Sequence, residues 1–419
     1  MGERVTLVGG CIALTLAAAC GGTANVSGKV EAVRFGDLAE APVPKVRFDR
    51  DHRAACGEEE VGPISELVRF PYLQHVQTDA ALLMWTAVSP DPYQVRVARP
   101  DGSPVGELRS SLQADASPAD AHQHVARLTG LEPGSMHCYS LHAPDGTMLT
   151  PPTGFRTAPE AGSGAPVRFV AFGDSGHGGA DQRAVFEHVQ GVSFDVLLVT
   201  GDVAYGSGTR GELERNFFQI YEPMLVSIPS FPVLGNHDDY TDAGGPFREV
   251  FALPENGAPD GREYWYSFDW GDVHFVALDS ERMGEVQAAW LEADLAGNEL
   301  PWTIVYTHRS AYSSGSHGSD LTFRRVFGAI LMEHRVPLVL SGHDHHYERS
   351  KPIGDTTYVV TGGGGRGTRA PDGASFTEFA LDVLHFVHVT VEGEDLFLHA
   401  IDATGQEFDY VHIRLPGAG

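Results

Sequence analysis

The sequence predicts a multidomain protein in which an all-β sandwich precedes an α/β layered domain with mixed sheets flanked by helices. The chain has 419 residues, of which 42% are hydrophobic, so it can form two or three packed domains. The stretch from about residue 66 to residue 159 consists of short strands separated by turn residues. From about residue 166 onwards, apolar strands alternate with helical segments instead.

Residues 1–20 are predicted to be an export signal. Arg4 precedes the apolar run Val5–Ala19, which is shorter than the ~20 residues of a membrane span and ends directly before Cys20. Small residues before Cys20 and glycines after it resemble the cleavage box of bacterial lipoproteins, in which this cysteine carries the lipid. Ordinary cleavage after Ala19 and an uncleaved N-terminal span are the alternatives. We expect an exported protein, either a cell-envelope lipoprotein or secreted, that touches a membrane only through a lipid on Cys20.

Residues 21–65 mix glycine, proline and charged residues, and we interpret them as a tether. Once the leader is removed, Cys56 and Cys138 remain. In an oxidising compartment they could form a disulfide, whereas two unpaired buried thiols fit the sequence equally well. No Cys-x-x-Cys pair occurs, which excludes a zinc ribbon.

Residues 66–159 are predicted to form the β-sandwich. Its expected strands are Ala80–Ala87, Tyr93–Arg99, His122–Leu128, His137–His142 and Gly154–Thr157. Trp85, the corner Leu131–Gly134 ahead of Tyr139, and the closing Phe155–Thr157 resemble a fibronectin type III module. We interpret Trp85 and Tyr139 as core residues rather than as a binding platform.

Residues 166–419 are predicted to form the α/β layered domain. The expected strands are Val167–Phe172, Val196–Thr200, Phe231–Leu234, Val273–Leu278, Thr303–Tyr306 and Leu338–Leu340. The expected helices are Ala180–Val189, Glu212–Tyr221, Glu285–Leu295 and Phe323–His334.

Oxygen and nitrogen ligands for metal ions follow five of these strands directly. Such positions attract attention because ligands of α/β sheets bind beyond the carboxyl ends of the strands. Each junction is a weak signal alone, but all five together, in this order, are not explained by structural roles. The junctions are Gly173–Gly176 (GDSG), Gly201–Tyr205 (GDVAY), Gly235–Asp238 (GNHD), Val305–His308 (VYTH) and Gly342–His345 (GHDH).

This series of motifs resembles the calcineurin-like metallophosphoesterases and, within them, the purple acid phosphatases. The resemblance covers about residues 66–412, because larger members of that family also place a fibronectin-like module ahead of the catalytic domain. Many relatives have Asp-x-His at the first junction, whereas Gly176 replaces the histidine here and Tyr205 supplies an oxygen ligand. A phenolate favours Fe(III) over zinc, and its charge transfer to iron colours the family.

The resemblance implies a dinuclear centre with Fe(III) and a divalent ion, which could be zinc, iron or manganese. The ferric ligands would be Asp174, Asp202, Tyr205 and His345, and the divalent ligands Asn236, His308 and His343, with Asp202 bridging both. The expected reaction is hydrolysis of small phosphate esters by a metal-activated hydroxide. The resemblance also suggests His237 and His317 as phosphate binders and proton donors. Arg366 could face the mouth of the pocket, but Arg309 and Arg366 are both interpreted as structural or solvated residues.

Charge narrows the range of partners. The chain carries 29 Lys+Arg and 56 Asp+Glu, a formal net charge of −27, which argues against nucleic acid as a partner because phosphate backbones repel such a surface. The sequence indicates no oligomeric state. A phosphodiesterase or nucleotidase on the same metal centre is one alternative function, and a related iron and calcium alkaline phosphatase is another. A surface-tethered binding protein with an inert metallophosphoesterase fold is the alternative from a different class.

Overall fold

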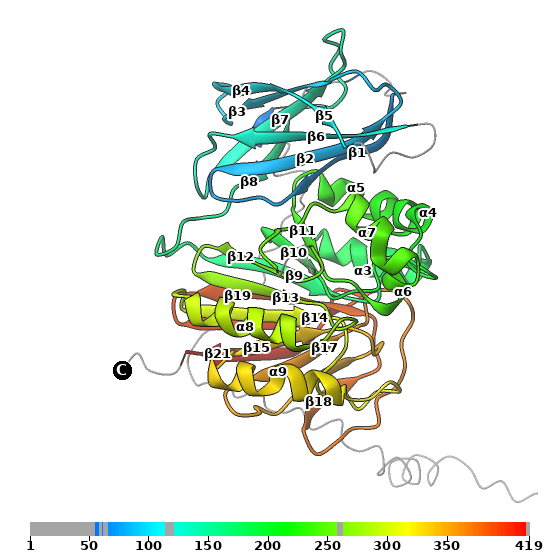
Figure 1. The fold of residues 1–419 in the computed structure, drawn as a ribbon, viewed down its shortest axis with the longest axis vertical. Helices are drawn as coiled ribbons and strands as arrows, with labels where there is room; N and C mark the ends of the chain where they lie inside the picture. The colour runs from blue at the N-terminus through cyan, green and yellow to red at the C-terminus, as the bar shows by residue number, and fades with distance from the viewer. Residues whose placement is uncertain (1–54, 58–60, 62–65, 114–120, 258–262, 416–419) are drawn as a thin grey trace, which may run out of the picture.

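The computed structural model describes residues 55–57, 61, 66–113, 121–257 and 263–415. The predicted leader, the lipid site at Cys20 and most of the predicted tether lie outside these residues. Figure 1 shows a β-rich region in the upper part of the molecule and an α/β region below it.

Residues 67–156 form two four-stranded antiparallel sheets that share one core. One sheet contains, in order, β1 (Leu67–Gln74), β2 (Ala80–Ala87), β6 (His122–Thr129) and β5 (Ser111–Leu112). The other contains β4 (Pro104–Arg109), β3 (Gln94–Ala98), β7 (Met136–His142) and β8 (Thr153–Arg156). Trp85 and Tyr139 are fully buried core residues, as expected. The predicted strands are present, three further strands complete the sheets, and the likeness to a fibronectin type III module stays a prediction.

Cys56 and Cys138 are joined by a disulfide across 82 residues of chain. The bond attaches the segment before the first sheet to strand β7. The sequence left open whether these cysteines form a disulfide or stay unpaired, and the structure shows the disulfide.

The α/β region is built on two mixed sheets. The six-stranded sheet has the order β11 (Ser230–Pro232), β10 (Val196–Val199), β9 (Val167–Phe172), β19 (His385–Glu392), β20 (Asp395–Asp402) and β21 (Glu407–Arg414). The seven-stranded sheet has the order β12 (Tyr266–Trp270), β13 (Val273–Leu278), β14 (Trp302–Thr307), β15 (Leu338–Ser341), β17 (Thr357–Thr361), β16 (Tyr347–Ser350) and β18 (Thr377–Leu381). In each sheet the strands that precede the predicted site run parallel to one another.

The two sheets pack face to face, and helices cover their outer sides. Phe169 of β9 and Phe275 of β13 meet edge to face at 5.2 Å between the sheets. Helices α8 (Glu285–Gly297) and α9 (Leu321–Glu333) bury apolar residues against the seven-stranded sheet (Figure 1). Around the six-stranded sheet lie α3 (Ala180–Val189), α4 (Arg210–Leu213), η2 (Glu214–Phe218), α5 (Gln219–Leu225), α6 (Asn236–Asp239), η3 (Asp242–Gly244) and α7 (Gly245–Val250).

The predicted helix Glu212–Tyr221 is the one expected helix that the structure interrupts. It consists of α4, one π-helical turn η2, and α5. Consecutive Phe217 and Phe218 of the π turn are both buried. A hydrophobic repeat near 3.6 residues cannot distinguish such a turn from an ordinary helix, so the interruption was not predictable from the pattern. The strand expected at Phe231–Leu234 is shorter and lies at Ser230–Pro232.

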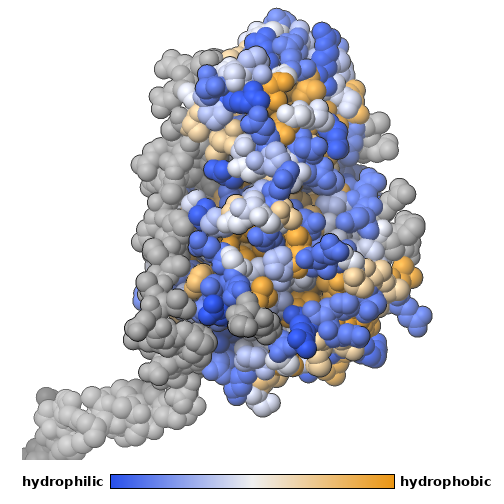
Figure 2. Space-filling model, turned by 90° about the vertical axis from the view of Figure 1, so that its left-hand side faces the viewer, coloured by the Kyte–Doolittle hydropathy of each residue, from blue (hydrophilic) through white to orange (hydrophobic). Residues whose placement is uncertain are grey.

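The visible surface is mostly hydrophilic. In Figure 2 hydrophilic residues cover most of the visible face, and hydrophobic residues are scattered among them. Within the described part of the chain, no helix has the length and apolar character needed to cross a membrane.

A buried arginine joins the β-sandwich to the helices of the α/β region. Arg69 of β1 is 4% exposed, and its Nε donates to Glu214 Oε2 of η2 at 2.8 Å. Its guanidinium carbon lies 3.9 Å from the ring centroid of Phe218. Nearby, the Tyr72 hydroxyl donates to the carbonyl of Val250 at 2.7 Å. The contact is therefore both ionic and apolar, which makes it sensitive to removal of either charge.

We expect Arg69→Ala to lower the free energy of unfolding by about 3 kcal/mol, because the partly buried Glu214 carboxylate loses its partner. Urea denaturation measures this change. The control is Arg96→Ala, which removes an arginine whose ion pair with Glu107 is more than half exposed, and it should change stability by less than about 1 kcal/mol. Equal effects of the two substitutions would contradict the proposed strength of the interface.

His274 of the β12–β13 hairpin bonds to an aspartate of helix α8 and to one of strand β12. Its Nδ1 lies 2.7 Å from Asp269 Oδ1 and its Nε2 lies 2.9 Å from Asp294 Oδ2. Burial lowers the pKa of His274, but the hydrogen bonds and charges of the two aspartates outweigh burial and raise it to about 9. The imidazolium therefore stabilises the fold.

This raised pKa predicts a pH-dependent stability. The contribution is fully present below about pH 6.5, the usual histidine pKa, and is lost as pH rises through about 9. His274→Gln should cost about 2–3 kcal/mol at pH 6 and much less at pH 9.5, as measured by urea denaturation at both pH values. His334→Gln, which removes a histidine paired with a half-exposed glutamate, is the control and should cost less than about 1 kcal/mol at either pH value. A cost of His274→Gln that is the same at both pH values would refute the prediction.

Candidate metal centre

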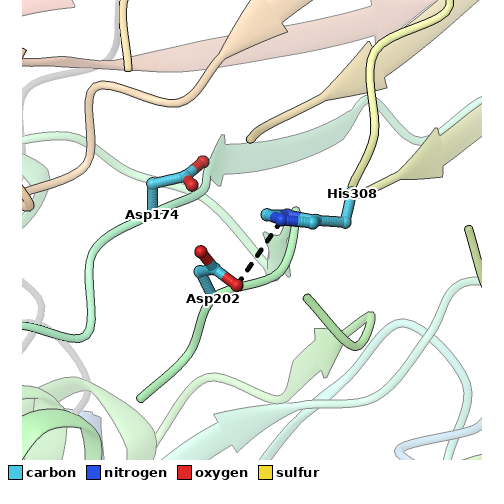
Figure 3. A group of neighbouring side chains, drawn as sticks. All are labelled: Asp174, Asp202 and His308. Atoms are coloured by element: carbon cyan, nitrogen blue, oxygen red, sulfur yellow. Dashed lines mark ion pairs between the residues drawn. The ribbon is translucent and has the colours of Figure 1, made fainter. Parts of the chain in front are cut away.

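The five predicted junctions converge at one edge of the paired sheets. They follow β9, β10, β11, β14 and β15, whose carboxyl ends point toward the same cleft. Ligand atoms of Asp174, Asp202 and His308 all lie within 4.8 Å of one another, and all three residues are buried. Figure 3 shows these side chains facing one another across the cleft, with the His308 and Asp202 ion pair at 3.5 Å. Two oxygen donors and one imidazole nitrogen form a group that can hold a metal ion.

Three predicted ferric ligands form the first cluster. The Tyr205 hydroxyl donates to Asp174 Oδ1 at 3.0 Å and lies 3.1 Å from His345 Nε2. His345 Nε2 lies 3.3 Å from the same Asp174 oxygen. These three atoms lie close enough together that all three could bind the same ion.

The predicted divalent ligands form the second cluster, around His308 Nε2. This nitrogen lies 3.1 Å from Asn236 Oδ1 and 3.1 Å from His343 Nδ1. Asp202 Oδ1 is 3.5 Å from His308 Nε2, and the Asp202 carboxylate also acts on the Tyr205 hydroxyl of the first cluster. The structure thus places Asp202 between the two clusters, as a bridging ligand requires.

His308 presents a free ring nitrogen to the second cluster, and the His343 imidazole is uncharged. His308 Nδ1 donates to the carbonyl of Thr200 at 2.9 Å, which leaves the lone pair on Nε2 facing the cluster. Burial and the nearby His308 lower the pKa of His343 to about 2, so its imidazole is neutral. Neutral imidazoles bind metals through the free nitrogen, and the donor set therefore fits an ion.

The acidic groups also fit a cation. Burial opposes ionisation of Asp174, yet the hydrogen bond and charge of His345 lower its pKa to about 2. Burial and the carboxylates of Asp174 and Asp202 raise the pKa of Tyr205 well above its usual value of 10. A phenolate at Tyr205 therefore needs a cation beside it, and a metal ion supplies that charge.

Three of these ligands have a strained backbone. The φ angles of Asp174, Asp202 and His343 are +57°, +51° and +69°, in the left-handed region that residues other than glycine seldom adopt. Such strain persists only where surrounding contacts hold it, and it concentrates at functional sites. The neighbouring Gly235 allows a close approach, since a Cβ there would lie 2.1 Å from Asp202 Oδ1.

His237 and His317, the predicted phosphate binders, line a cavity of about 170 Å³ beside the two clusters. His237 Nδ1 lies 2.7 Å from the carbonyl of Gly206 and must donate to it, which leaves Nε2 free for a ligand. The His317 ring packs against the His343 ring at a tilt of 32°, with 4.2 Å between centroids. Its Nε2 lies 3.0 Å from Arg369 Nη1 and accepts from it. The structure thus brings both histidines to the predicted pocket.

Asp238 and Asp344 hold the loops of the site together. Both lie inside the predicted motifs, but the sequence assigned no role to either of them. The Asp238 carboxylate accepts N–H groups of Val203 at 3.0 Å, Ala204 at 2.9 Å and Gly235 at 2.9 Å. It therefore joins the loop after β10 to the loop after β11. Burial and the Asp202 carboxylate raise the pKa of Asp238 to about 7, against these donors, which favour the ionised form.

Asp344 plays a similar part for the loop that carries His317. Its Oδ2 accepts from the Ser313 hydroxyl at 2.6 Å and its Oδ1 accepts from the His317 N–H at 2.9 Å. The only sequence signal for these roles was their position inside the GNHD and GHDH motifs.

Arg309 was interpreted as structural or solvated, and the structure places it in an ion pair beside the site. Its Nε and Nη2 donate to Glu281 at 2.7 and 2.8 Å, and its Nη1 lies 3.2 Å from His343 Nε2. The ion pair therefore borders the second cluster. Glu281 lies in the loop after β13, and nothing in the sequence connected this loop with the site.

Comparisons with known proteins agree with this geometry. Residues 167–347 match the sequence model of the calcineurin-like phosphoesterase family. These residues form a calcineurin-like metallophosphoesterase domain. The matched stretch begins at the first residue of β9 and ends at the first residue of β16, so it includes every predicted ligand.

Purple acid phosphatases are among the relatives that match more than half of the chain. Purple acid phosphatase 22 of Arabidopsis thaliana is 27% identical over 291 residues, which cover 64% of each chain. An uncharacterized protein of Mycobacterium tuberculosis is 30% identical over 295 residues, 59% of this chain and 54% of that protein. The chain therefore spans between half and two thirds of the length of these relatives. A purple acid phosphatase from yellow lupin seeds has a similar fold, with a TM-score of 0.71 at 22% identity over 82% of this chain and 74% of that one.

Asp238→Asn provides a test of how the metal-site loops are held. An asparagine has one carbonyl oxygen in place of the carboxylate, so at least one of the three N–H donors loses its partner. We expect metal affinity to fall by about 10- to 100-fold, as measured by competition with a chelator.

Asp239→Asn is the matched control. It removes the same charge one residue away, where the carboxylate pairs with Arg282 outside the cluster, and should leave metal affinity unchanged. Equal affinities of the Asp238 variant and the wild type would show that this carboxylate does not hold the site.

Proposed function

We propose that this protein is a dinuclear-metal phosphomonoesterase, similar to purple acid phosphatases, that hydrolyses small phosphate esters. The observation that carries the proposal is the arrangement of seven predicted ligands in two clusters that share Asp202, beside a pocket lined by His237 and His317. The homologous purple acid phosphatases support the choice of reaction.

We assign Fe(III) to the cluster with Tyr205, since a phenolate and two carboxylates suit the higher charge. A divalent ion, zinc, iron or manganese, is assigned to the cluster with Asn236, His308 and His343, whose donors are neutral. When bound, the two ions lower the pKa of a solvent nucleophile, hold a phosphate oxygen and offset the charge that develops on phosphorus.

The histidines handle phosphate and protons. Because Gly206 fixes the His237 ring through Nδ1, its Nε2 is directed to exchange a proton with phosphate or with the leaving oxygen. The P–O bond to the alcohol breaks, a P–O bond to the solvent oxygen forms, and the alcohol oxygen takes up a proton. His317 binds phosphate from the opposite side of the pocket through Nδ1, since Nε2 accepts from Arg369.

We also propose that the protein is exported by the leader at residues 1–20, with cleavage at Cys20. The disulfide between Cys56 and Cys138 supports an oxidising compartment, where such bonds persist.

The decisive experiment combines metal analysis with turnover of p-nitrophenyl phosphate. Protein produced with iron available should contain about one iron and one divalent ion per chain and should release phosphate. His308→Ala should lose most of the divalent ion and at least about 100-fold in kcat, because one ligand of the second cluster is gone.

His334→Ala is the control, since this histidine directly follows α9, pairs with Glu292 of α8 and does not line the pocket. It should keep wild-type metal content and turnover. Turnover that is equal in the wild type and in His308→Ala would refute the catalytic proposal and favour an inert, tethered binding protein.

A further inference from the structure

Tyr240 is an exposed aromatic residue at the rim of the second cluster. It directly follows helix α6, which carries Asn236 and His237, and it is 63% exposed. Its φ and ψ angles of −62° and −32° continue the helical conformation, and residues four apart lie on the same face of a helix. The short helix therefore places the tyrosine beside Asn236. Packing in the core does not explain a ring at this position, because most of its surface faces water.

The Tyr240 hydroxyl meets the amide of the predicted ligand Asn236. Asn236 Nδ2 donates to Tyr240 Oη at 3.2 Å, and Asn236 Oδ1 lies 3.1 Å from His308 Nε2 in the second cluster. The amide thus presents its nitrogen to the tyrosine and its oxygen to the cluster. Only the oxygen can bind a metal ion, because the NH₂ group of an amide is a donor without a lone pair to share.

An amide ligand benefits from a hydrogen-bond partner of this kind. The terminal torsion of an asparagine side chain is broad, so the amide plane is poorly defined unless a contact holds it. The hydrogen bond from Nδ2 to Tyr240 holds this plane with Oδ1 beside His308. A cation at Oδ1 makes the N–H groups more positive and strengthens the bond to the hydroxyl, so the two interactions support each other.

The ring of Tyr240 contacts the predicted phosphate binder as well. Its centroid lies 5.1 Å from that of the His237 ring, at an angle of 63°. The ring of Tyr205 also lies 4.4 Å from that of His237, and His237 Nδ1 donates to the carbonyl of Gly206. Two aromatic contacts and one hydrogen bond therefore limit how the imidazole can turn. Loss of the exposed tyrosine ring would remove one of the three.

We propose that Tyr240 is a positioning residue with two separable roles. Its hydroxyl orients Asn236 for the divalent ion, and its ring keeps His237 Nε2 directed at phosphate. The inference rests on the proposed function, which assigns these two roles to Asn236 and His237. Tyr240 itself binds neither the ion nor the phosphate.

The role of the hydroxyl is tested by metal affinity. Tyr240→Phe keeps the ring and removes only the hydroxyl, so the Zn²⁺ affinity of the iron-loaded full chain should fall by about 10-fold in competition with a chelator. Iron content and the urea midpoint should stay at their wild-type values. Tyr264→Phe is the matched control, since it removes a hydroxyl that donates to the carbonyl of Ala243 at 2.9 Å, and it should leave Zn²⁺ affinity unchanged.

The role of the ring is tested at saturating Zn²⁺, where the loss of metal affinity no longer matters. Under this condition Tyr240→Phe should bind orthophosphate as the wild type does, as measured by calorimetry, and should regain wild-type kcat with p-nitrophenyl phosphate. Tyr240→Leu should bind orthophosphate about fivefold more weakly, which is the scale of one aromatic contact, and should keep a lowered kcat. Equal orthophosphate affinities of the two variants would overturn the role of the ring.

The outcomes separate this inference from the proposed function. If p-nitrophenyl phosphate is hydrolysed and Tyr240→Phe binds Zn²⁺ within about twofold of wild type, the role of the hydroxyl is wrong while the phosphatase stands. If the metal-loaded wild type turns over no ester, the proposed function fails, and the Zn²⁺ and orthophosphate affinities still decide on Tyr240. Weaker Zn²⁺ binding to Tyr240→Phe, with Tyr264→Phe unchanged, would then support the positioning role.

Discussion

The convergence of buried acidic groups is the constraint on which the rest of the structure depends. Asp174 and Asp202 are at most 2% exposed, and their carboxylates surround the phenol of Tyr205. Burying such groups without a cation costs several kcal/mol, and only part of that cost is offset by N–H donors. The backbone N–H of His343 donates to Asp174 Oδ2 at 2.7 Å, and that of His237 donates to Asp202 Oδ1 at 3.0 Å. The backbone thus orients the carboxylates before any ion binds, and the ion completes the charge balance.

Much of this architecture could be predicted from the sequence, because the signals are local. An apolar run long enough for a strand, followed at once by glycine and a polar ligand, places that ligand at a strand end. Asp174 and Asp202 follow β9 and β10 in this way, and the structure brings both to the cleft. Tyr205, three residues after Asp202, was found through the resemblance to the purple acid phosphatases. The expected β-sandwich strands also agree, since their alternation is local.

What could not be predicted depends on contacts between distant segments. Arg366 is far from Asp174 in the sequence, and only the folded chain shows that the two share a backbone hydrogen bond. Asp238 was visible in its motif, but its N–H partners at 203 and 204 come from another loop. The π turn η2 buries the consecutive Phe217 and Phe218, and a hydrophobic repeat near 3.6 residues does not distinguish it from an ordinary helix. Arg366 is exposed, which agrees with its interpretation as a solvated residue, and the fold adds that it lines the pocket.

The β-sandwich is connected to the metal centre through this same π turn. Arg69 of the sandwich binds Glu214 in η2, and Asn216, two residues further, donates from Nδ2 to the Tyr205 carbonyl at 2.8 Å. Glu212, just before the turn, accepts the N–H of Gly206 at 2.8 Å. One short helical segment therefore contacts the sandwich on one side and the backbone around Tyr205 on the other. Because ligand geometry tolerates little displacement, a sandwich that fixes this segment also fixes the phenol of the first cluster. The sandwich thus contributes to the site without supplying a ligand, by limiting where Tyr205 can lie.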